Sequence, residues 1–478
     1  MPHYGDNVFL TAKSAPKRST RKTNSEESIM KAMKRLMTGV AAMAMAASLA
    51  ACAGGTNAPA SNTTADQGIE GTAENPVTLN YWGWQKGTAD QVKLFNDSHK
   101  NVQIKYTEVK GGADALNGLR NAASAGNAPD LQQGSQDWMV PLLAEKVITD
   151  VTSWITPSEK DFRESAFKAS EVDGRNFVVP TAQAPQFFVY QAPVYDKLNL
   201  SAPKTMDEFV EQGATLAGAG HKITNMAGED PSTLVNWAWQ AGASWYTVDG
   251  DAWKINFLDD ATMEAAGVTQ KLIDEGAIST QTFADYAAVQ QMYDKGNTAT
   301  RHIWTWSTNG MVNNFKESFG NWKAAPIPEF STGGKANVSP IGGIFVTEQS
   351  KSKKAAAEAA VWLATNKESV TLAADPIKGS SSFPVVADSD PFVAQLLPEK
   401  LFGANHAEAV KVAKEASKNI VTNWTYGPNY TAMYTEMADG WAKVITKQQK
   451  VTDLLEHMQE WTVNDLKKKG INAVDGSK

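Results

Sequence analysis

Strand-like and helix-like segments alternate between residues 77 and 145, and this alternation restricts the possible folds more than any other feature of the sequence. The strand-like segments have apolar and polar residues at a period of two, the pattern of a half-buried strand. Strands are expected at 77–82, 102–109 and from 130, and helices at 89–98, 114–125 and 138–145. A β-α-β-α-β order of this kind predicts a parallel sheet covered by helices, and therefore an α/β fold.

The later sequence continues with short strands and a rising share of helix. Further strands are expected at 176–180, 186–191, 298–304, 323–327 and 342–347. Further helices are expected at 230–241, 261–274, 284–295, 355–365, 369–374, 407–420, 431–446 and 452–468. Another helix is expected to begin after Thr205, because Glu208 stands three residues later in the pattern of a capping box. The sequence contains no repeat of solenoid period.

The first 51 residues have the features of a lipoprotein signal peptide. Lys34 and Arg35 form a positive flank, and the apolar run at 36–51 is shorter than the roughly 20 residues that span a bilayer as a helix. The segment 49–52, Leu-Ala-Ala-Cys, resembles the bacterial lipobox, in which small residues precede a lipidated cysteine. Cys52 is the single cysteine of the chain. We therefore expect a leader at 1–51, with the signal proper at about 33–51, and a lipid on Cys52.

Composition divides the remaining chain into a linker and a large body. Residues 52–75 are rich in small and polar residues and nearly free of aliphatic ones, which predicts a flexible tether. The body, from about residue 76 to 473, exceeds one typical core and predicts two domains. Without the first 51 residues the chain has 37 Lys and Arg against 49 Asp and Glu, so its formal charge changes from −7 to −12. This acidic balance gives no electrostatic reason to bind nucleic acid or anionic lipid.

Tryptophan is the conspicuous residue type, and all 15 tryptophans lie beyond the leader. Six of them form pairs at a spacing of two residues: Trp82 and Trp84, Trp237 and Trp239, Trp304 and Trp306. On a strand this spacing puts both rings on one face. Many tryptophans of a large protein belong to its core, but one ring of such a pair at the end of a strand can stand in a cleft.

Several motifs occur in a characteristic order along the body. They lie at 121–131, 172–180, 203–209, 292–300 and 355–363. The first combines a glycine that ends a helix, a proline stop and the entry to a strand. Together these motifs resemble those of the extracellular solute-binding lipoproteins of ABC importers, in the family similar to maltodextrin-binding protein. Met206 stands where that family usually has Trp, and Gln191 where it often has Asn.

The resemblance implies an α/β protein with the two-lobed, type II fold of periplasmic binding proteins, in which each lobe is discontinuous in sequence. Lobe one would take residues 76–186 and 324–348, and lobe two residues 190–322 and 352–473. Chain crossings near 187–190, 323 and 349 would form the hinges. Ligand would bind between the lobes, at the C-terminal ends of the strands, and would favour the closed state.

In that family the ligand is usually a carbohydrate, which offers an apolar face to aromatic rings and hydroxyl groups to amides and carboxylates. The candidate ligand-binding residues are Trp84, Gln85, Lys86, Gln136, Asp137, Gln183, Gln186, Trp237, Trp239, Trp304, Trp306, Gly343, Trp424 and Tyr426. Trp237 and Trp239 cannot share a helix face, so one is expected in the core and the other in the cleft. Structural alternatives are core or loop packing for the aromatic residues, helix capping for Asp137, hinge or surface positions for Gln183 and Gln186, and a turn for Gly343.

The resemblance implies a receptor, with no catalytic residue and no cofactor, that captures an oligosaccharide and delivers it to a membrane permease. The sequence has no metal-spaced Cys/His cluster and none of the H-E-x-x-H, G-x-S-x-G or Walker motifs. One alternative is a secreted glycoside hydrolase, which would need two carboxylates about 5–10 Å apart. Another is a receptor for a peptide, a polyamine or an anion. We expect a monomer anchored by its lipid to the outer face of the cell membrane.

Overall fold

The computed structural model describes residues 71–478, so the predicted leader, Cys52 and most of the predicted tether lie outside the described residues. Five strands form the first sheet in the order β2-β1-β3-β14-β6. These strands are β1 (Val77–Gly83), β2 (Val102–Glu108), β3 (Leu131–Ser135), β6 (Val179–Ala182) and β14 (Gly342–Val346). β1, β2 and β3 are parallel as predicted, whereas β14 enters from far along the chain and is antiparallel to both of its neighbours.

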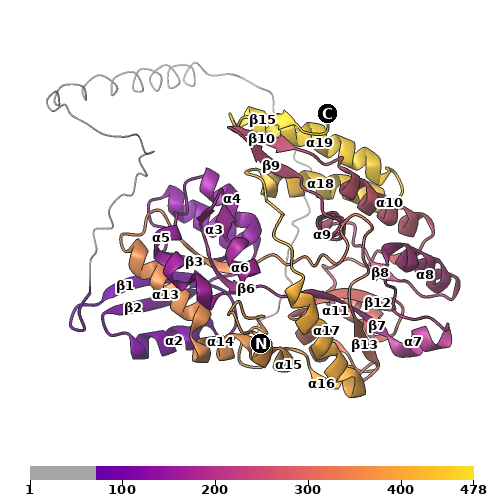
Figure 1. Ribbon diagram of the computed structural model, residues 1–478, viewed down its shortest axis with the longest axis horizontal. Helices are drawn as coiled ribbons and strands as arrows, with labels where there is room; N and C mark the ends of the chain where they lie inside the picture. The colour runs from indigo at the N-terminus through magenta and orange to yellow at the C-terminus, as the bar shows by residue number, and fades with distance from the viewer. Residues whose placement is uncertain (1–70) are drawn as a thin grey trace, which may run out of the picture. The chain divides into compact units, whose positions relative to one another are not determined.

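Helices cover both faces of this sheet, with α3 and α4 on one side of β1–β3 and α2 and α14 on the other (Figure 1). The elements around the sheet are α2 (Thr88–Ser98), α3 (Ala113–Ser124), α4 (Gln136–Ala144), α5 (Thr152–Ile155), η1 (Thr156–Asp161), α6 (Glu164–Lys168), β4 (Glu171–Val172), β5 (Arg175–Asn176), α13 (Lys353–Thr365) and α14 (Lys367–Ala374). In β1 every second side chain is buried, which is the two-residue period seen in the sequence.

The buried residues on this sheet form the first core, a cluster that includes Leu79, Leu119, Leu131 and Phe345. Seven residues between Ala356 and Ala364 in α13 also belong to it. The prediction that residues 352–473 lie in lobe two is therefore wrong for α13. The alanine-rich face of this helix allows close packing on the sheet, and its sequence pattern alone does not say which sheet it covers.

A second sheet, in the order β12-β7-β13, is antiparallel throughout. Its strands are β7 (Gln186–Gln191), β12 (Thr300–Trp304) and β13 (Trp322–Ala325). Phe188 of β7 belongs to the second core, which includes Phe209, Trp237 and Trp441. Phe187 and Val189 point to the opposite face and belong to the third core, which includes Ile303, Trp322 and Phe402. The uninterrupted apolar run in β7 is thus explained by burial on both faces.

The remaining elements surround the second and third cores. The helices are α7 (Ala192–Lys197), α8 (Met206–Gly218), α9 (Ser232–Ala241), α10 (Asp260–Asp274), α11 (Tyr286–Asp294), α12 (Ser307–Asn314), α15 (Asp390–Leu396), α16 (Glu399–Phe402), η2 (Gly403–Asn405), α17 (His406–Lys418), α18 (Tyr430–Ile445) and α19 (Val451–Lys468). The short strands are β8 (Thr224–Asn225), β9 (Tyr246–Asp249), β10 (Ala252–Ile255), β11 (Ile278–Ser279) and β15 (Ala473–Asp475). None of the helices described in residues 71–478 is long and apolar enough to cross a membrane.

Three passages of chain connect the first core with the other two. They lie between β6 and β7 (183–185), between β13 and β14 (326–341), and between α14 and α15 (375–389). The predicted crossings near 187–190 and 323 fall inside β7 and β13, which begin at Gln186 and Trp322, one residue before each predicted crossing. The predicted crossing near 349 is also wrong, since α13 remains on the first core.

The predicted cap of α8 is present in a modified form. The Thr205 hydroxyl oxygen accepts the backbone N–H of Glu208 at 3.2 Å, as a capping box requires. The Glu208 carboxylate accepts the backbone N–H of Lys204 at 2.6 Å instead of that of Thr205. The helix therefore begins where the sequence predicted, with its acidic side chain reaching one residue further back.

Candidate functional site

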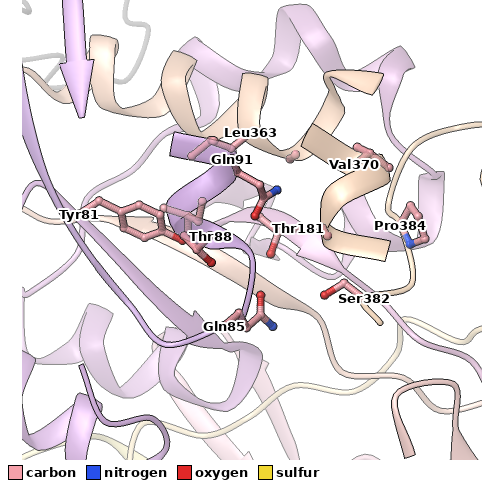
Figure 2. Close-up of a pocket in the computed structure, with 12 residues that line it drawn as sticks. Tyr81, Gln85, Thr88, Gln91, Thr181, Leu363, Val370, Ser382 and Pro384 are labelled. Carbon is pink, nitrogen blue, oxygen red and sulfur yellow. The ribbon is translucent and has the colours of Figure 1, made fainter. Parts of the chain in front are cut away.

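A small cavity lies beside the first sheet, next to the loop that follows β1 (Figure 2). Polar side chains of Gln85, Thr88, Gln91, Thr181 and Ser382 line it, together with Tyr81. Its interior measures about 30 Å³, which is room for one or two water molecules. This cavity is therefore too small to hold a sugar ring, and the candidate Gln85 lines an interior space of water-sized volume.

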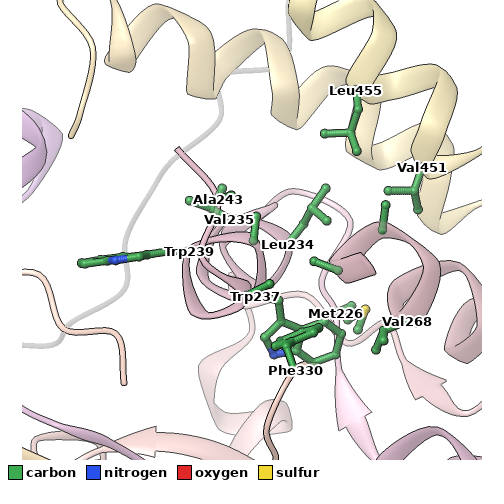
Figure 3. Packing of buried hydrophobic residues seen from close by; sticks show 14 of the residues in the cluster. Met226, Leu234, Val235, Trp237, Trp239, Ala243, Val268, Phe330, Val451 and Leu455 are labelled. Atoms are coloured by element: carbon green, nitrogen blue, oxygen red, sulfur yellow. The ribbon is translucent and has the colours of Figure 1, made fainter. Parts of the chain in front are cut away.

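Trp237 and Trp239 lie on α9 with their rings pointing to different sides, as the spacing on a helix predicts (Figure 3). Both rings are buried, so which of them contacts ligand stays a prediction. Trp237 packs edge-on against Phe209 and Phe330 inside the second core. Trp239 instead stacks on Trp424, with 5.5 Å between ring centroids and 21° between ring planes.

Trp239, Trp424 and Tyr426 form an aromatic cluster at one edge of the second core. The ring of Tyr426 meets both indoles edge-on, at 6.4 Å and 6.2 Å. Among residues 71–478, neither the Trp239 nor the Trp424 indole N–H finds a hydrogen-bond acceptor, although both are buried. Buried donors are normally paired, so these two indole N–H groups are candidates to bind a ligand oxygen.

Asp137 comes from the other side of the boundary between the cores. It lies in the first turn of α4, and α4 packs against α18. The Ser135 hydroxyl donates a hydrogen bond to the Asp137 carboxylate. Burial raises the pKa of Asp137, and this effect exceeds the opposing effects of Ser135 and of the Asp137 backbone N–H. The same carboxylate contributes to the raised pKa of Tyr426, after burial as the main cause.

The structure thus brings four of the sequence-predicted residues together: Asp137 from one side, and Trp239, Trp424 and Tyr426 from the other. Tyr430 joins them from α18, with its ring 4.6 Å from that of Tyr426. Tyr430 is not among the predicted ligand-binding residues, although it directly precedes the helix predicted at 431–446. This arrangement offers hydrogen-bond donors, a carboxylate acceptor and aromatic surface in one place.

Several predicted glutamines have structural partners that account for them. The Gln136 side-chain oxygen accepts the backbone N–H of Ile341 at 3.1 Å. The Gln183 side-chain oxygen accepts the Ser165 hydroxyl at 2.9 Å. The backbone of Gln186 both donates to and accepts from the Asn337 side chain, while its own side-chain oxygen finds no donor within residues 71–478. Gln136 and Gln183 therefore both contact the connecting passage 326–341, and for Gln183 this is the alternative role at a hinge.

Gly343 was expected to let ligand approach the backbone, and the structure offers a packing explanation for this glycine. A Cβ atom on Gly343 would stand 2.4 Å from a methyl carbon of Val178 and 2.7 Å from the backbone oxygen of Val179. Gly343 is glycine because β14 and β6 approach each other closely at that point. Its role is packing within the first sheet.

Three further candidates lie elsewhere on the boundary. The rings of Trp304 and Trp306 are parallel, with centroids 5.6 Å apart, and Trp306 is 54% exposed. Trp304 is the last residue of β12 and pairs with Gln186, the first residue of β7. Gln186 directly follows the connecting passage 183–185. Lys86 is exposed, and its charge contributes to the lowered pKa of Asp375. Trp304 and Trp306 form an aromatic platform separate from the cluster of Trp239, Trp424 and Tyr426, and Lys86 contributes a charged rim.

Gln133 is a positioning residue that the sequence interpretation missed. Its side-chain oxygen accepts two backbone N–H groups, that of Trp84 at 2.7 Å and that of Gln85 at 3.1 Å. This contact fixes the loop after β1, and the ring of Trp84 then packs 5.7 Å from that of Trp138. The sequence feature that indicates this role is the pair of neighbouring glutamines, Gln132 and Gln133, inside a buried strand.

Replacing Gln133 by leucine is expected to lower the free energy of unfolding by about 1–3 kcal/mol, because two backbone donors would lose their acceptor. Urea unfolding followed by tryptophan fluorescence measures this change. Gln291→Leu, at an exposed position on α11, is the matched control and should leave stability within about 0.5 kcal/mol. Equal stabilities of the two variants would contradict the positioning role.

Within residues 71–478 no group of three His, Cys, Asp or Glu side chains is arranged to hold a metal ion. The groups available for ligand binding at the described site are therefore its aromatic rings, its hydroxyl and indole groups and the Asp137 carboxylate.

Comparison with known proteins gives a family and a fold. The family model of bacterial extracellular solute-binding proteins matches residues 75–369. Proteins of Brucella abortus and Brucella suis that carry the name binding protein are 22% identical over 275 residues, which is 55% of this chain. The match spans 65% of the length of those relatives.

Solved structures of sugar-binding proteins share the fold. The galacto-N-biose/lacto-N-biose I-binding protein of Bifidobacterium longum has a TM-score of 0.73 at 22% identity, over 84% of this chain and 99% of that one. A binding protein of Bifidobacterium animalis subsp. lactis, in complex with β-1,6-galactobiose, has a TM-score of 0.69 at 20% identity, over 84% and 100%. The sugar-binding protein MalE of Xanthomonas citri has a TM-score of 0.68 at 15% identity, over 82% and 98%.

These structures have two lobes of the type II binding-protein fold, so the first core corresponds to one lobe and the second and third cores to the other. The predicted α/β, two-lobed fold class is confirmed, while the predicted lobe boundaries other than α13 stay predictions. The matched model covers more than half of the chain. The chain therefore belongs to the bacterial extracellular solute-binding proteins.

Proposed function

We propose that this protein is the solute-binding component of an ABC importer and captures an oligosaccharide between its two lobes. The observation that carries the proposal is the stacked pair of Trp239 and Trp424, whose indole N–H groups have no acceptor within residues 71–478, next to Tyr426, whose pKa the Asp137 carboxylate helps to raise. Aromatic faces suit the apolar side of a sugar ring, while the indole N–H groups and the carboxylate suit its oxygens and hydroxyls.

Two relatives in fold support a sugar as the ligand. The Bifidobacterium longum protein was solved with lacto-N-biose and the Bifidobacterium animalis protein with β-1,6-galactobiose. Within residues 71–478 the described salt bridges place no arginine or lysine against Asp137, which argues against an anionic ligand. The aromatic rings favour a neutral oligosaccharide over a polyamine or a peptide, and the ligand panel below tests that choice.

The proposal includes how the protein reaches its partner. It would act as a monomer without catalysis or cofactor, held outside the cell membrane by a lipid on Cys52, and would deliver the sugar to the permease subunits. Replacing Cys52 by serine is expected to release the protein from the membrane fraction with unchanged ligand affinity. Retention of the variant in washed membranes would contradict the anchor.

Isothermal titration calorimetry against a panel of neutral oligosaccharides tests the ligand class. The proposal predicts saturable binding of at least one glycan, with a change in tryptophan fluorescence. Polyamines, peptides and inorganic anions serve as alternative ligands in the same panel. Saturable binding of one of these alone would overturn the oligosaccharide assignment, and sustained release of new reducing ends from a glycan would replace the receptor by a hydrolase.

A further inference from the structure

Asn337 is a buried amide in the connecting passage 326–341. Its side chain is 2% exposed, and the next residue, Val338, belongs to the second core. The side chain bonds to the backbone of Gln186 in both directions. Its oxygen accepts the Gln186 N–H at 2.9 Å, and its nitrogen donates to the Gln186 carbonyl oxygen. The amide thus takes the place that a neighbouring strand would have beside Gln186.

The backbone of Asn337 bonds at the same time to a third segment. Its N–H donates to the carbonyl oxygen of Asn419, and its carbonyl oxygen accepts the N–H of Val421, both at 2.9 Å. Buried backbone groups need partners of this kind, and an asparagine side chain offers both a donor and an acceptor. Alanine, leucine or aspartate at this position could not satisfy both backbone groups of Gln186. Three segments far apart in the sequence therefore meet at one residue.

Gln186 gives this contact a fixed base. It is the first residue of β7, the middle strand of the second sheet, and it pairs in register with Trp304 of β12. β13 pairs with β7 on the other side. Because β7 has partners along both edges and is buried on both faces, it has little freedom to move. The side chain of Asn337 therefore fixes its own backbone relative to the second sheet.

The segment that Asn337 holds leads into the aromatic cluster. Trp424 follows Val421 by three residues, so their Cα atoms are at most about 11 Å apart. From 422 to 429 no backbone N–H group donates to another backbone group within residues 71–478. The bond from Val421 to Asn337 is therefore the last backbone hydrogen bond that fixes this segment before the turn at the start of α18. Beyond that bond, the position of the Trp424 ring depends on its packing against neighbouring rings.

We infer that Asn337 is a positioning residue for the sugar site. Its side chain binds Gln186, its backbone binds the segment 419–421, and together these contacts set the place of Trp424. Asn337 acts through Trp424 and not by a contact of its own, because its amide is already occupied by Gln186. The inference rests on the proposed function only for its effect on affinity, since the environment of the Trp424 ring can be measured without ligand.

Nuclear magnetic resonance of the indole N–H groups, in protein with isotope-labelled tryptophan, tests the inference without ligand. Trp424→Phe identifies the Trp424 signal. In Asn337→Ala this signal is expected to shift or broaden, whereas that of Trp441, whose N–H donates to the Ala227 oxygen, stays in place. Calorimetry with a glycan that wild type binds should show about 3- to 30-fold weaker binding by Asn337→Ala.

Asn176→Ala is the matched control for a loss of stability alone. Asn176 is also 2% exposed, and its side-chain nitrogen donates to the Ser170 hydroxyl at 2.7 Å, on the side of the first core. This variant should lose stability as Asn337→Ala does, but should keep the wild-type Trp424 signal and affinity. Equal changes of the Trp424 signal in both variants would overturn the inference, as would an unchanged Trp424 signal in Asn337→Ala.

Hydrogen exchange of the wild-type protein decides the matter even when Asn337→Ala folds poorly. The N–H of Val421 is expected to exchange more slowly than those at 422–427, and equal rates would overturn the inference. Calorimetry on the same samples separates this inference from the proposed function. Equal glycan affinity of wild type and Asn337→Ala refutes the positioning role alone, whereas a shifted Trp424 signal in a protein that binds no glycan refutes the oligosaccharide assignment alone.

Discussion

Replacing Phe188 by alanine is expected to lower the free energy of unfolding by about 3–5 kcal/mol. Phe188 is fully buried in the middle strand of the second sheet, where it pairs with His302 of β12 and Ala325 of β13. Its ring meets that of Phe209 at 6.0 Å in the second core. Truncation would leave a cavity at the point where three strands and a helix meet, and the surrounding β-sheet has little freedom to collapse into it.

Chemical unfolding monitored by far-ultraviolet circular dichroism measures this effect. Phe283→Ala is the matched control, because that ring is 38% exposed and its loss should change stability by no more than about 0.5 kcal/mol. If Phe188→Ala were as stable as Phe283→Ala, the central position of β7 in the second lobe would be wrong.

Replacing Trp424 by alanine is expected to weaken oligosaccharide binding by at least about 2 kcal/mol, or roughly 30-fold. The change removes the ring on which Trp239 stacks. It also removes one of the two indole N–H groups of this cluster that have no acceptor within residues 71–478. Trp424→Phe keeps an aromatic ring but removes the N–H, and should weaken binding by about 0.5–1.5 kcal/mol, the typical value of one hydrogen bond.

Trp441→Phe separates an effect on binding from an effect on folding. Trp441 is buried in the same core, but its indole N–H already donates to the backbone oxygen of Ala227 at 2.9 Å. This control should reduce stability and leave affinity unchanged, as measured by calorimetry at a temperature where both variants are folded. An equal loss of affinity in Trp441→Phe and Trp424→Phe would show that the N–H of Trp424 has no special role in binding.

The first sheet could be predicted from the sequence because its strands and helices alternate locally. Val77, Leu79 and Tyr81 are buried at every second position of β1, and this pattern is present within a few residues. The place of β14 between β3 and β6 could not be predicted in the same way. That pairing joins residues more than 150 positions apart, and no local pattern reports it.

The candidate site likewise combines residues that local sequence patterns indicate with long-range contacts that they do not. Asp137 was found because it follows a strand, and Trp424 because it lies in an aromatic, polar loop. That Asp137 acts on Tyr426, which packs against Trp424, depends on how α4 packs against α18, and no local sequence pattern reports that packing. Gln136 and Gly343 also follow the expected pattern, yet Gln136 binds the backbone of Ile341, and Gly343 packs closely against Val178.

A crystal structure of the complex with the oligosaccharide that binds most tightly tests the central claim most directly. We expect a sugar unit against the Trp239–Trp424 pair, with a ligand oxygen accepting an indole N–H and a hydroxyl donating to the Asp137 carboxylate. A sugar bound only on the exposed face of Trp306, or only in the groove of about 640 Å³ beside Arg120 and Lys469, would contradict the site proposed between Asp137 and the aromatic cluster.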